Sequence, residues 1–553
     1  MKSIHFENFR RFAKSPEFTF GDITILVGGN NAGKSTLQKA LLLVFDNLRT
    51  LKWKRGSANS IFEDGFQSPQ FRFDANDFHD LGLGTFKRSL TRGAKEKSME
   101  FALCISNFKV YVTVEPDGAG EELPIGKIAA IEIWDSQRHI LYDFNFNTHR
   151  MSARFEKVEG NGDPKFDKIQ ARIVEIRDAL ETENDPLEAA LANQELEKLL
   201  KIRNAFVQIT SRKSESAVAE TDLNNYLGIK GFNRVTNSAL AAYIENIEAY
   251  VSTIGSKTVR VIGLDDDELT TLTEEEQKEE IWNGTPEDRS NEQVLGDKLS
   301  LILESAKALD QELRLPHVYY LQAHGVSQKM LYTIDDKNDF VAQTIHEYAR
   351  RGINPGDMPD TFIRKWMVEF GLGTNYKIDS IGGEGYTVKI ETPDGFVDLA
   401  DLGMGANQLM VLLFGLATIM FEEGHHGKDG GKSYIPKFII VEEPEQNLHP
   451  RLQSKLADLF ADVTKDESYR FLIETHSEYL VRRTQVMVAE MNLTEEELEK
   501  QNPFKVYYFP GEGRPYDMKF LPSGRFENKF EEGFFDESAK WHMEILKKEK
   551  ARK

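Results

Sequence analysis

The alternation of apolar and polar residues in the first 155 positions predicts a mixture of strands and one long helix. Residues Ile23–Val27 form a short, largely apolar run typical of a buried strand, and Leu37–Leu48 has helical spacing. Two alternating segments, Ser98–Ile105 and Phe108–Val114, predict antiparallel strands. The turn residues Glu115–Gly118 are expected to end the second of them.

The pattern changes in the middle of the chain and then returns to alternating strands and helices. Residues 167–206 are rich in Glu, Lys, Leu and Ala at helical spacing, and a further helix is expected over 291–313. The acidic stretch 265–280 between them is expected to be a surface segment. From about Leu315 an α/β pattern resumes. We therefore expect a mixed α/β protein made of residues 1–155 and 315–553, with a helical insertion at 156–314.

Composition narrows the class of protein further. The 553 residues are 40% hydrophobic and carry a net charge of −21, which argues against a surface coated with positive charge for nucleic acid. Two local basic clusters are expected to be solvated surface rather than DNA sites: Lys52–Arg55, and Lys87, Arg88, Arg92, Lys95 and Lys97. No apolar run reaches the ~18 residues of a membrane span, and the N-terminus lacks a signal-peptide core. The single cysteine, Cys104, excludes an intrachain disulfide, so a reducing cytoplasm is expected.

The segment from Gly28 to Thr36 fits the phosphate-binding template G-x-x-x-x-G-K-[ST] and lies between the predicted strand and helix. Backbone N–H groups of such a turn, together with the helix start, cradle phosphate oxygens. Lys34 would reach the β- and γ-phosphates and Ser35 would ligate Mg²⁺. The expected nucleotide-binding residues are Gly28, Asn30, Asn31, Ala32, Gly33, Lys34, Ser35 and Thr36. A chance match is the alternative, and the strand–loop–helix context disfavours it.

Two strand ends in the second half carry side chains suited to hydrolysis. The apolar strand Phe438–Val441 runs into Glu442 and Glu443, which point to opposite sides of the strand. Glu442 would hold the hydration shell of Mg²⁺, and Glu443 would orient and polarise the attacking water. About thirty residues later the apolar run Phe471–Ile473 predicts a second strand that leads to His476, where the histidine could contact a γ-phosphate or that water.

Two further segments have weaker individual signals. The glycine turn Leu402–Gln408 opens the apolar helix Leu409–Met420, and a helix start of this kind presents free N–H groups to an anion. The run Gln446–Pro450 follows the carboxylates and is expected to turn the chain. For His449 a structural role is at least as well supported as a catalytic one.

In order and content these segments resemble the ABC-type ATPases of the RecF/SMC branch, and more narrowly the bacterial ATPases related to the nucleotide-binding part of OLD-family proteins. The resemblance covers about 1–150 and 315–553. It is carried by Glu7–Phe12, Gly28–Thr36, Leu402–Gln408, Glu442–Pro450, Thr475–Glu478 and the tail Gly533–Asp536. It implies an ABC-type ATPase head: a mixed sheet core with an antiparallel β subdomain, interrupted by the helical, coiled-coil-like insertion.

The resemblance also implies a head-to-head dimer with ATP and Mg²⁺ held between the subunits. Gly403, Gly405 and Asn407 of one copy would then touch the γ-phosphate bound by the other. The sequence departs from the family pattern at Gly403, where a serine is usual, and at Glu442, where Asp is common. Gln67 and Gln70 are both candidates for the glutamine loop, and the sequence does not choose between them.

Taken together, the residues and the resemblance predict an ATPase in which an ATP-gated dimer controls an effector protein, encoded by a neighbouring gene, or acts on nucleic acid. Relatives of this kind suggest bacterial defence against phage. Two other functions stay open: a RecF-like DNA-repair clamp acting directly on DNA, and a slow-turnover scaffold or sensor that restrains a toxic partner. The roughly 75 residues after His476 carry no acidic Toprim pattern, so nuclease activity in this chain is not expected.

Overall fold

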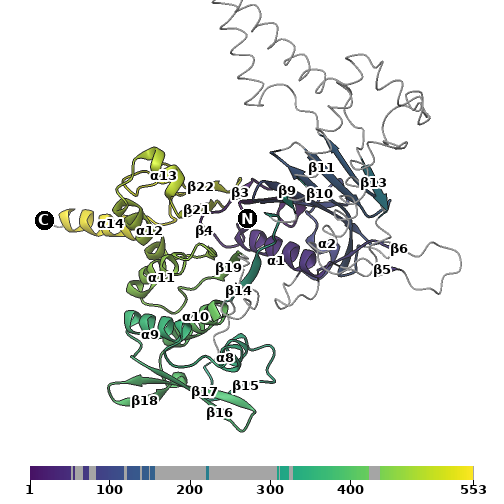
Figure 1. Cartoon of the computed structure of the whole chain (residues 1–553). Coiled ribbons are helices and arrows are strands. Elements are labelled where there is room, and N and C mark those ends of the chain that lie inside the picture. The colour runs from purple at the N-terminus through teal and green to yellow at the C-terminus, as the bar shows by residue number, and fades with distance from the viewer. Residues whose placement is uncertain are drawn as a thin grey trace, which may run out of the picture.

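The structure is a computed structural model of the whole chain. It describes residues 1–51, 54–55, 66–73, 83–117, 121–137, 140–148, 150–155, 219–222, 305, 308–309, 312–322, 328–421 and 436–551. The predicted segments 167–206 and 265–280, most of the helix at 291–313 and nearly all of the insertion 156–314 lie outside the described residues. Figure 1 shows the arrangement of the elements.

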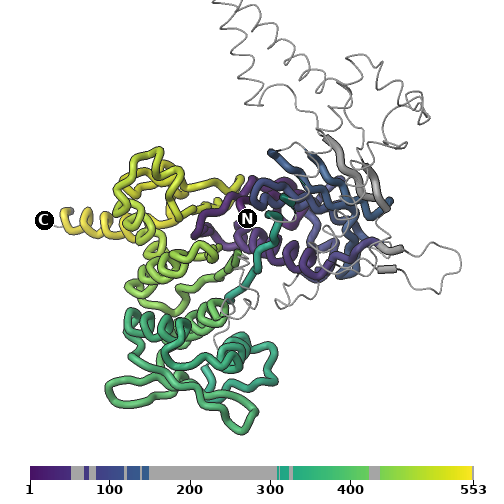
Figure 2. The backbone as a smooth tube through the Cα atoms, in the orientation of Figure 1, coloured from purple at the N-terminus to yellow at the C-terminus, as the bar shows by residue number. Residues whose placement is uncertain are grey.

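Both ends of the chain contribute strands to one central sheet. Among the described residues it has six strands, and all neighbours are parallel except the last pair. One strand from the N-terminal part lies between two strands from the C-terminal part, and in Figure 2 the purple N-terminal tube lies beside the yellow-green C-terminal tube. In order across the sheet the strands are β14 (His317–Leu321), β19 (Lys437–Glu442), β20 (Tyr469–Glu474), β4 (Ile23–Gly28), β21 (Phe504–Phe509) and β22 (Tyr516–Asp517).

Helices cover both faces of this sheet. Because side chains on both faces are buried, its strands are continuous runs of mostly apolar residues. Leu26 of β4 packs in one hydrophobic cluster with α1 (Lys34–Thr50). Its neighbours Ile25 and Val27 point to the other face. That face packs against α10 (Met404–Phe421), α11 (Pro450–Val463) and α12 (Glu478–Glu490).

A second, antiparallel sheet packs beyond α1. In β8 and β9 buried and less buried residues alternate, as expected when one face meets the core and the other faces outward. Among the described residues this sheet has ten strands: β1 (Ser3–Phe9), β2 (Phe12–Lys14), β3 (Phe18–Thr19), β7 (Gln70–Arg72), β8 (Met99–Ile105), β9 (Phe108–Pro116), β10 (Ile125–Asp135), β11 (Ile140–Asn145), β12 (Arg150–Phe155) and β13 (Ala219–Asp222). The short elements β5 (Lys54–Arg55), β6 (Phe66–Gln67) and α2 (Phe86–Ser89) lie outside this sheet.

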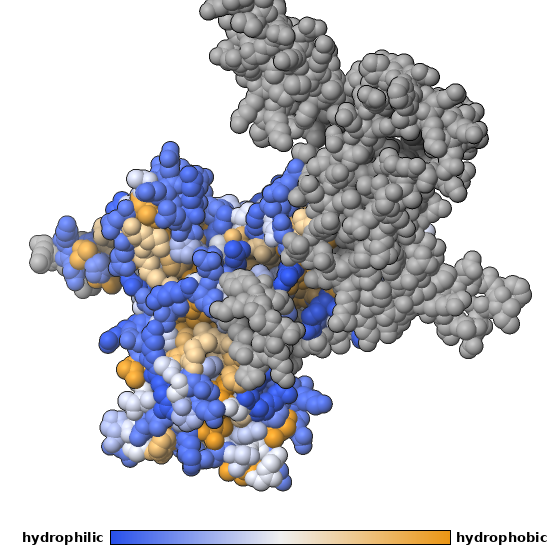
Figure 3. Space-filling model, in the orientation of Figure 1, coloured by the Kyte–Doolittle hydropathy of each residue, from blue (hydrophilic) through white to orange (hydrophobic). Residues whose placement is uncertain are grey.

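A small lobe packs on α10 at the far side of the central sheet (Figure 1). It consists of α8 (Phe340–Arg350), α9 (Met358–Phe370), β15 (Tyr332–Thr333), β16 (Tyr376–Ile381), β17 (Gly385–Thr392), β18 (Gly395–Asp398) and the 3₁₀ turn Leu399–Asp401. At the C-terminus, α13 (Glu495–Gln501) precedes β21, and α14 (Glu537–Ala551) projects from the body. The coloured residues on the face seen in Figure 3 are mostly hydrophilic, with hydrophobic residues scattered among them over the lobe and the C-terminal helices.

The predicted mixed α/β fold with a separate antiparallel sheet is confirmed. The strands and helices expected at residues 23–27, 37–48, 98–105, 108–114, 409–420, 438–441 and 471–473 are all present, with ends that differ by a few residues. β9 continues through Pro116, two residues into the expected turn Glu115–Gly118. α10 alone among the described residues is long and apolar enough to cross a membrane, but 78% of it is buried inside the protein, as in a core helix.

Candidate active site

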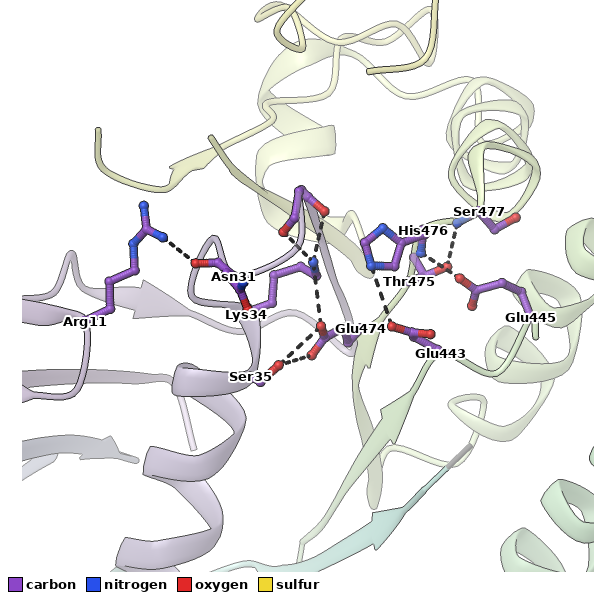
Figure 4. Close-up of polar contacts among 12 residues, drawn as sticks. Arg11, Asn31, Lys34, Ser35, Glu443, Glu445, Glu474, Thr475, His476 and Ser477 are labelled. Carbon is purple, nitrogen blue, oxygen red and sulfur yellow. Dashed lines mark hydrogen bonds and ion pairs between the residues drawn. The ribbon is translucent and has the colours of Figure 1, made fainter. Parts of the chain in front are cut away.

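The carboxyl ends of the parallel strands meet at one edge of the sheet, and the predicted chemical groups meet there too. The loop after β4 starts α1, β19 ends in Glu442, and β20 ends in Glu474 just before Thr475 and His476. Ligands of open parallel sheets bind at this edge. Figure 4 shows the side chains that converge there.

The loop from Gly28 to Thr36 has the backbone of a phosphate cradle. Gly28 and Gly33 have φ values of 148° and 113°, which L side chains rarely adopt. A Cβ at Gly28 would lie 2.2 Å from the carbonyl oxygen of Phe509, so a side chain is excluded there. α1 begins after Gly33 without a side-chain cap. Asn30 and Asn31 are exposed, whereas Ala32 and Thr36 are buried. The loop therefore presents backbone and a helix start, rather than side chains, to an anion.

Lys34 is buried at the floor of this cradle, with a side chain 3% exposed. Its Nζ donates hydrogen bonds to the carbonyl oxygens of Gly28 at 2.9 Å and Gly29 at 3.0 Å. It also lies 3.6 Å from Oε1 of Glu474. Burial lowers the pKa of Lys34, while Glu474 and Glu443 oppose that shift. The ammonium group is thus held within the site by oxygens that a bound phosphate could replace.

Glu474 was not among the residues singled out from the sequence. Its carboxylate lies 3.3 and 3.4 Å from the Ser35 hydroxyl, which donates to it. Burial raises the pKa of Glu474 to about 7; Lys34 opposes this shift and the neighbouring Glu442 and Glu443 add to it. The one available signal was its position as a carboxylate at the end of an apolar strand, directly before Thr475 and His476.

Glu443 and His476 lie beside this group. Oε1 of Glu443 is 3.6 Å from Nε2 of His476, and Gln446 donates to the other carboxylate oxygen. Glu443 has a φ of 41°, a strained conformation for a non-glycine residue that is common at functional sites. Single donor atoms of Glu443, Glu474 and His476 lie within 4.8 Å of one another. Burial and Lys34 lower the pKa of His476, which favours a neutral ring.

Glu442 lies on the neighbouring strand, in register with Glu474. Its carboxylate accepts a hydrogen bond from the Tyr320 hydroxyl of β14, another contact that the sequence did not predict. Burial and the charge of Glu442 raise the pKa of Tyr320, so Tyr320 remains a donor. The Ser35 hydroxyl and the carboxylate of Glu474 supply oxygen donors of the kind that Mg²⁺ prefers, and Glu442 lies on the next strand. The residues present therefore fit a magnesium ion.

Arg11 is a further contact of the loop that sequence reasoning missed. Its guanidinium donates to the carbonyl oxygen of Asn31 and, at 2.8 Å, to that of Gly511. It thus joins the phosphate loop to the segment that follows β21.

The start of α10 is organised differently from the sequence expectation. Gly403 and Met404 are exposed, but Asn407 is fully buried and donates to the Tyr332 hydroxyl at 3.4 Å. In this structure the side chain of Asn407 supports the core of the lobe and does not face a surface that a second copy could meet. His449 caps α11, where its Nδ1 accepts from the N–H of Arg451 at 3.4 Å. Gln70 is an exposed residue of β7; the side chain of Gln67 lies outside the described residues, so the glutamine loop stays unassigned.

Two glycines at this helix start allow packing and function to be separated. A Cβ at Gly405 would lie 2.7 Å from the carbonyl oxygen of Asn447, whereas a Cβ at Gly403 meets nothing within 4 Å. We expect Gly405→Ala to destabilise the fold by about 1–3 kcal/mol through overpacking, and Gly403→Ala to leave stability unchanged. Thermal unfolding of the two variants measures this difference, and equal melting temperatures would contradict it.

The chain is similar to several solved structures and to one described protein family. Among solved structures, similar chains include the Smc head domain with an extended coiled coil bound to the C-terminal domain of ScpA from Pyrococcus furiosus, with 12% identity and a TM-score of 0.28 over 100% of this chain and 99% of that chain. The SMC head domain from Thermotoga maritima has 10% identity and a TM-score of 0.26 over 87% and 91%. TM-scores this low do not define a common overall arrangement. No curated protein matches the chain.

The profile of one family, described as an AAA ATPase domain, matches residues 1–481. The chain therefore belongs to this family of ATPase domains, whose members bind and hydrolyse ATP.

Proposed function

We propose that the protein is a magnesium-dependent ATPase of the ABC type, related to the OLD-family ATPases, in which ATP joins two copies and hydrolysis separates them. The observation that carries this proposal is the meeting of Lys34 and Ser35 with Glu443 and His476 at one sheet edge, from opposite ends of the chain. Hydrolysis of a bound triphosphate requires both groups: a cationic site that holds the phosphates and a base that activates water.

The roles of the residues follow from their positions. The loop N–H groups and Lys34 would bind the phosphates, and Ser35 and Glu474 would hold a magnesium ion, which would supply Lewis-acid chemistry toward the phosphoryl oxygens. Glu443 accepts a proton from the attacking water. The neutral ring of His476, whose Nε2 lies 3.6 Å from Glu443, has one N–H, which it donates to the γ-phosphate region.

The dimer is supported by the exposed glycine turn at the start of α10. Gly403 and Met404 present a helix start to solvent, and such a start favours an anion. A γ-phosphate bound by a second copy would supply that anion. We propose that the resulting ATP-gated dimer acts in the cytoplasm on an effector protein from a neighbouring gene or on nucleic acid, in bacterial defence against phage.

Sedimentation of the purified chain with and without Mg·ATP tests the dimer. We expect the mass to double when hydrolysis is blocked and Mg·ATP is present, and to return to the monomer when the nucleotide is removed. Gly403→Ala should weaken this association without lowering the melting temperature, because its Cβ meets nothing within the chain. A mass that does not respond to ATP would contradict the proposed gating.

A further inference from the structure

Ser35 faces Glu474 rather than Glu442. The Ser35 hydroxyl lies 3.3 and 3.4 Å from the two oxygens of Glu474. β20 lies between β4 and β19, so Glu474 is one strand closer to the phosphate loop than Glu442 is. The Glu442 carboxylate is instead engaged by the hydroxyl of Tyr320, on the side away from β4. Of the two strand-end carboxylates, Glu474 is therefore the one beside the serine of the loop.

The charges around Glu474 are unbalanced without a further cation. Glu474 and Glu442 are register partners on adjacent strands, and Glu443 follows directly. Within the described part of the chain, Lys34 is the one cation paired with Glu474, at 3.6 Å, and both side chains are at most 6% exposed. A buried carboxylate is stable only while it is paired and hydrogen-bonded.

Nucleotide binding would change this pairing. If Lys34 turned to the β- and γ-phosphates, Glu474 would lose its cation, and the phosphates would bring more negative charge to the same place. An unpaired buried carboxylate would then oppose binding by its desolvation and by Coulomb repulsion. A small divalent cation that prefers oxygen ligands would remove both penalties, because Glu474 and Ser35 would hold it and its charge would offset those of the carboxylate and the phosphates.

We propose that Glu474, together with Ser35, holds the magnesium ion of bound Mg·ATP, so that the partner of Glu474 changes from Lys34 in the nucleotide-free protein to Mg²⁺ in the nucleotide-bound protein. This inference rests on the proposed ATPase function. It leaves Glu442, held by Tyr320, in the outer hydration shell.

The test is the magnesium dependence of nucleotide affinity, measured by calorimetry with a non-hydrolysable ATP analogue and the full chain. The quantity is the ratio of Kd in excess EDTA to Kd in excess Mg²⁺. We expect Glu474→Gln to lower this ratio about tenfold or more, in the range seen when a supporting partner of a metal is removed. The affinity in EDTA should stay unchanged or rise, since a negative charge is lost. Ser35→Ala should lower the ratio similarly, and the double variant should add little because both residues serve one ion.

Glu442→Gln is the matched control, since it makes the same change in the same register on the next strand. We expect it to alter the ratio by less than Glu474→Gln does. The proposal would be overturned if Glu474→Gln kept the wild-type ratio, or if its nucleotide affinity rose equally with and without Mg²⁺. Glu474 would then serve only as the partner of Lys34 in the nucleotide-free protein. A fall in the ratio confined to Glu442→Gln would overturn it as well. If the wild-type chain binds no nucleotide in either condition, the proposed function itself fails. Glu474→Asp, which keeps the charge, should retain part of the ratio and serves if Glu474→Gln does not fold.

Discussion

Glu443→Gln should still bind Mg·ATP and should hydrolyse it about 10²–10³ times more slowly than the wild type, in the range expected for loss of a general base. The amide has the shape of the carboxylate, and its oxygen can still accept the hydrogen bond from Gln446. It cannot take a proton from water. Since Glu443 also repels the phosphates, its neutralisation should leave nucleotide affinity equal or higher. Phosphate release under single-turnover conditions, together with a binding isotherm, measures both effects.

Glu445→Gln is an instructive control for this result. Glu445 lies two residues further on and is buried, and its Oε1 accepts from the backbone N–H of His476 at 2.6 Å. It should therefore affect hydrolysis only through the position of His476, with a smaller loss of rate. Turnover by Glu443→Gln at the wild-type rate would refute the role of Glu443, and an equal loss in both variants would point to disturbed geometry rather than a lost base.

Much of the fold could be predicted from the sequence because its signals are local. β4 and β19 are apolar runs buried on both faces, and β8 and β9 alternate as half-exposed strands do. In both kinds of strand, the order of apolar and polar residues indicates which faces are buried. The phosphate loop could be predicted for the same reason, because the motif fixes glycine at Gly28 and Gly33, where the backbone adopts positive φ values.

The contacts of the site could be predicted less well, because they depend on strand order. The motif order indicated that Glu442 and Glu443 would meet the loop, but it did not reveal that β20 lies between them and β4. That placement makes Glu474 the neighbour of Ser35 and Lys34, and it leaves Glu442 to Tyr320. Asn407 shows the same dependence on tertiary packing. The resemblance implied that its side chain would meet a phosphate bound by a second copy, whereas the packing of the lobe buries it against Tyr332.

Lys34→Met should weaken nucleotide binding and should also lower the stability of the nucleotide-free protein, because Lys34 neutralises the buried carboxylate of Glu474. A charged hydrogen bond contributes about 1.5–3 kcal/mol, so loss of the ammonium from the phosphates predicts an affinity for Mg·ATP weaker by about 10–150-fold. In the nucleotide-free protein, Met fills a similar volume but leaves Glu474 buried without its cation. Breaking a buried pair in this way costs about 3–5 kcal/mol while the remaining group stays charged.

The penalty in stability should depend on pH. The pKa of Glu474 is already about 7, above that of a glutamate in an unfolded chain, so the folded state binds the extra proton and its stability falls as pH rises through that interval. Removing Lys34 raises the pKa of Glu474 further and extends the loss to higher pH. Lys34→Met should therefore be destabilised more at pH 8.5 than at pH 6.5 in thermal unfolding with EDTA and without nucleotide.

The double variant Lys34→Met, Glu474→Gln separates this charge effect from lost packing. With the carboxylate gone, most of the stability should return and the pH dependence of the difference from wild type should flatten, while nucleotide affinity stays low. If the double variant is as unstable as Lys34→Met, then the lysine supports the loop through its bonds to the Gly28 and Gly29 carbonyls rather than through Glu474. If the double variant recovers stability but not nucleotide binding, Lys34 has two separate roles. It neutralises Glu474 in the nucleotide-free protein, and it binds the phosphates once the nucleotide is present.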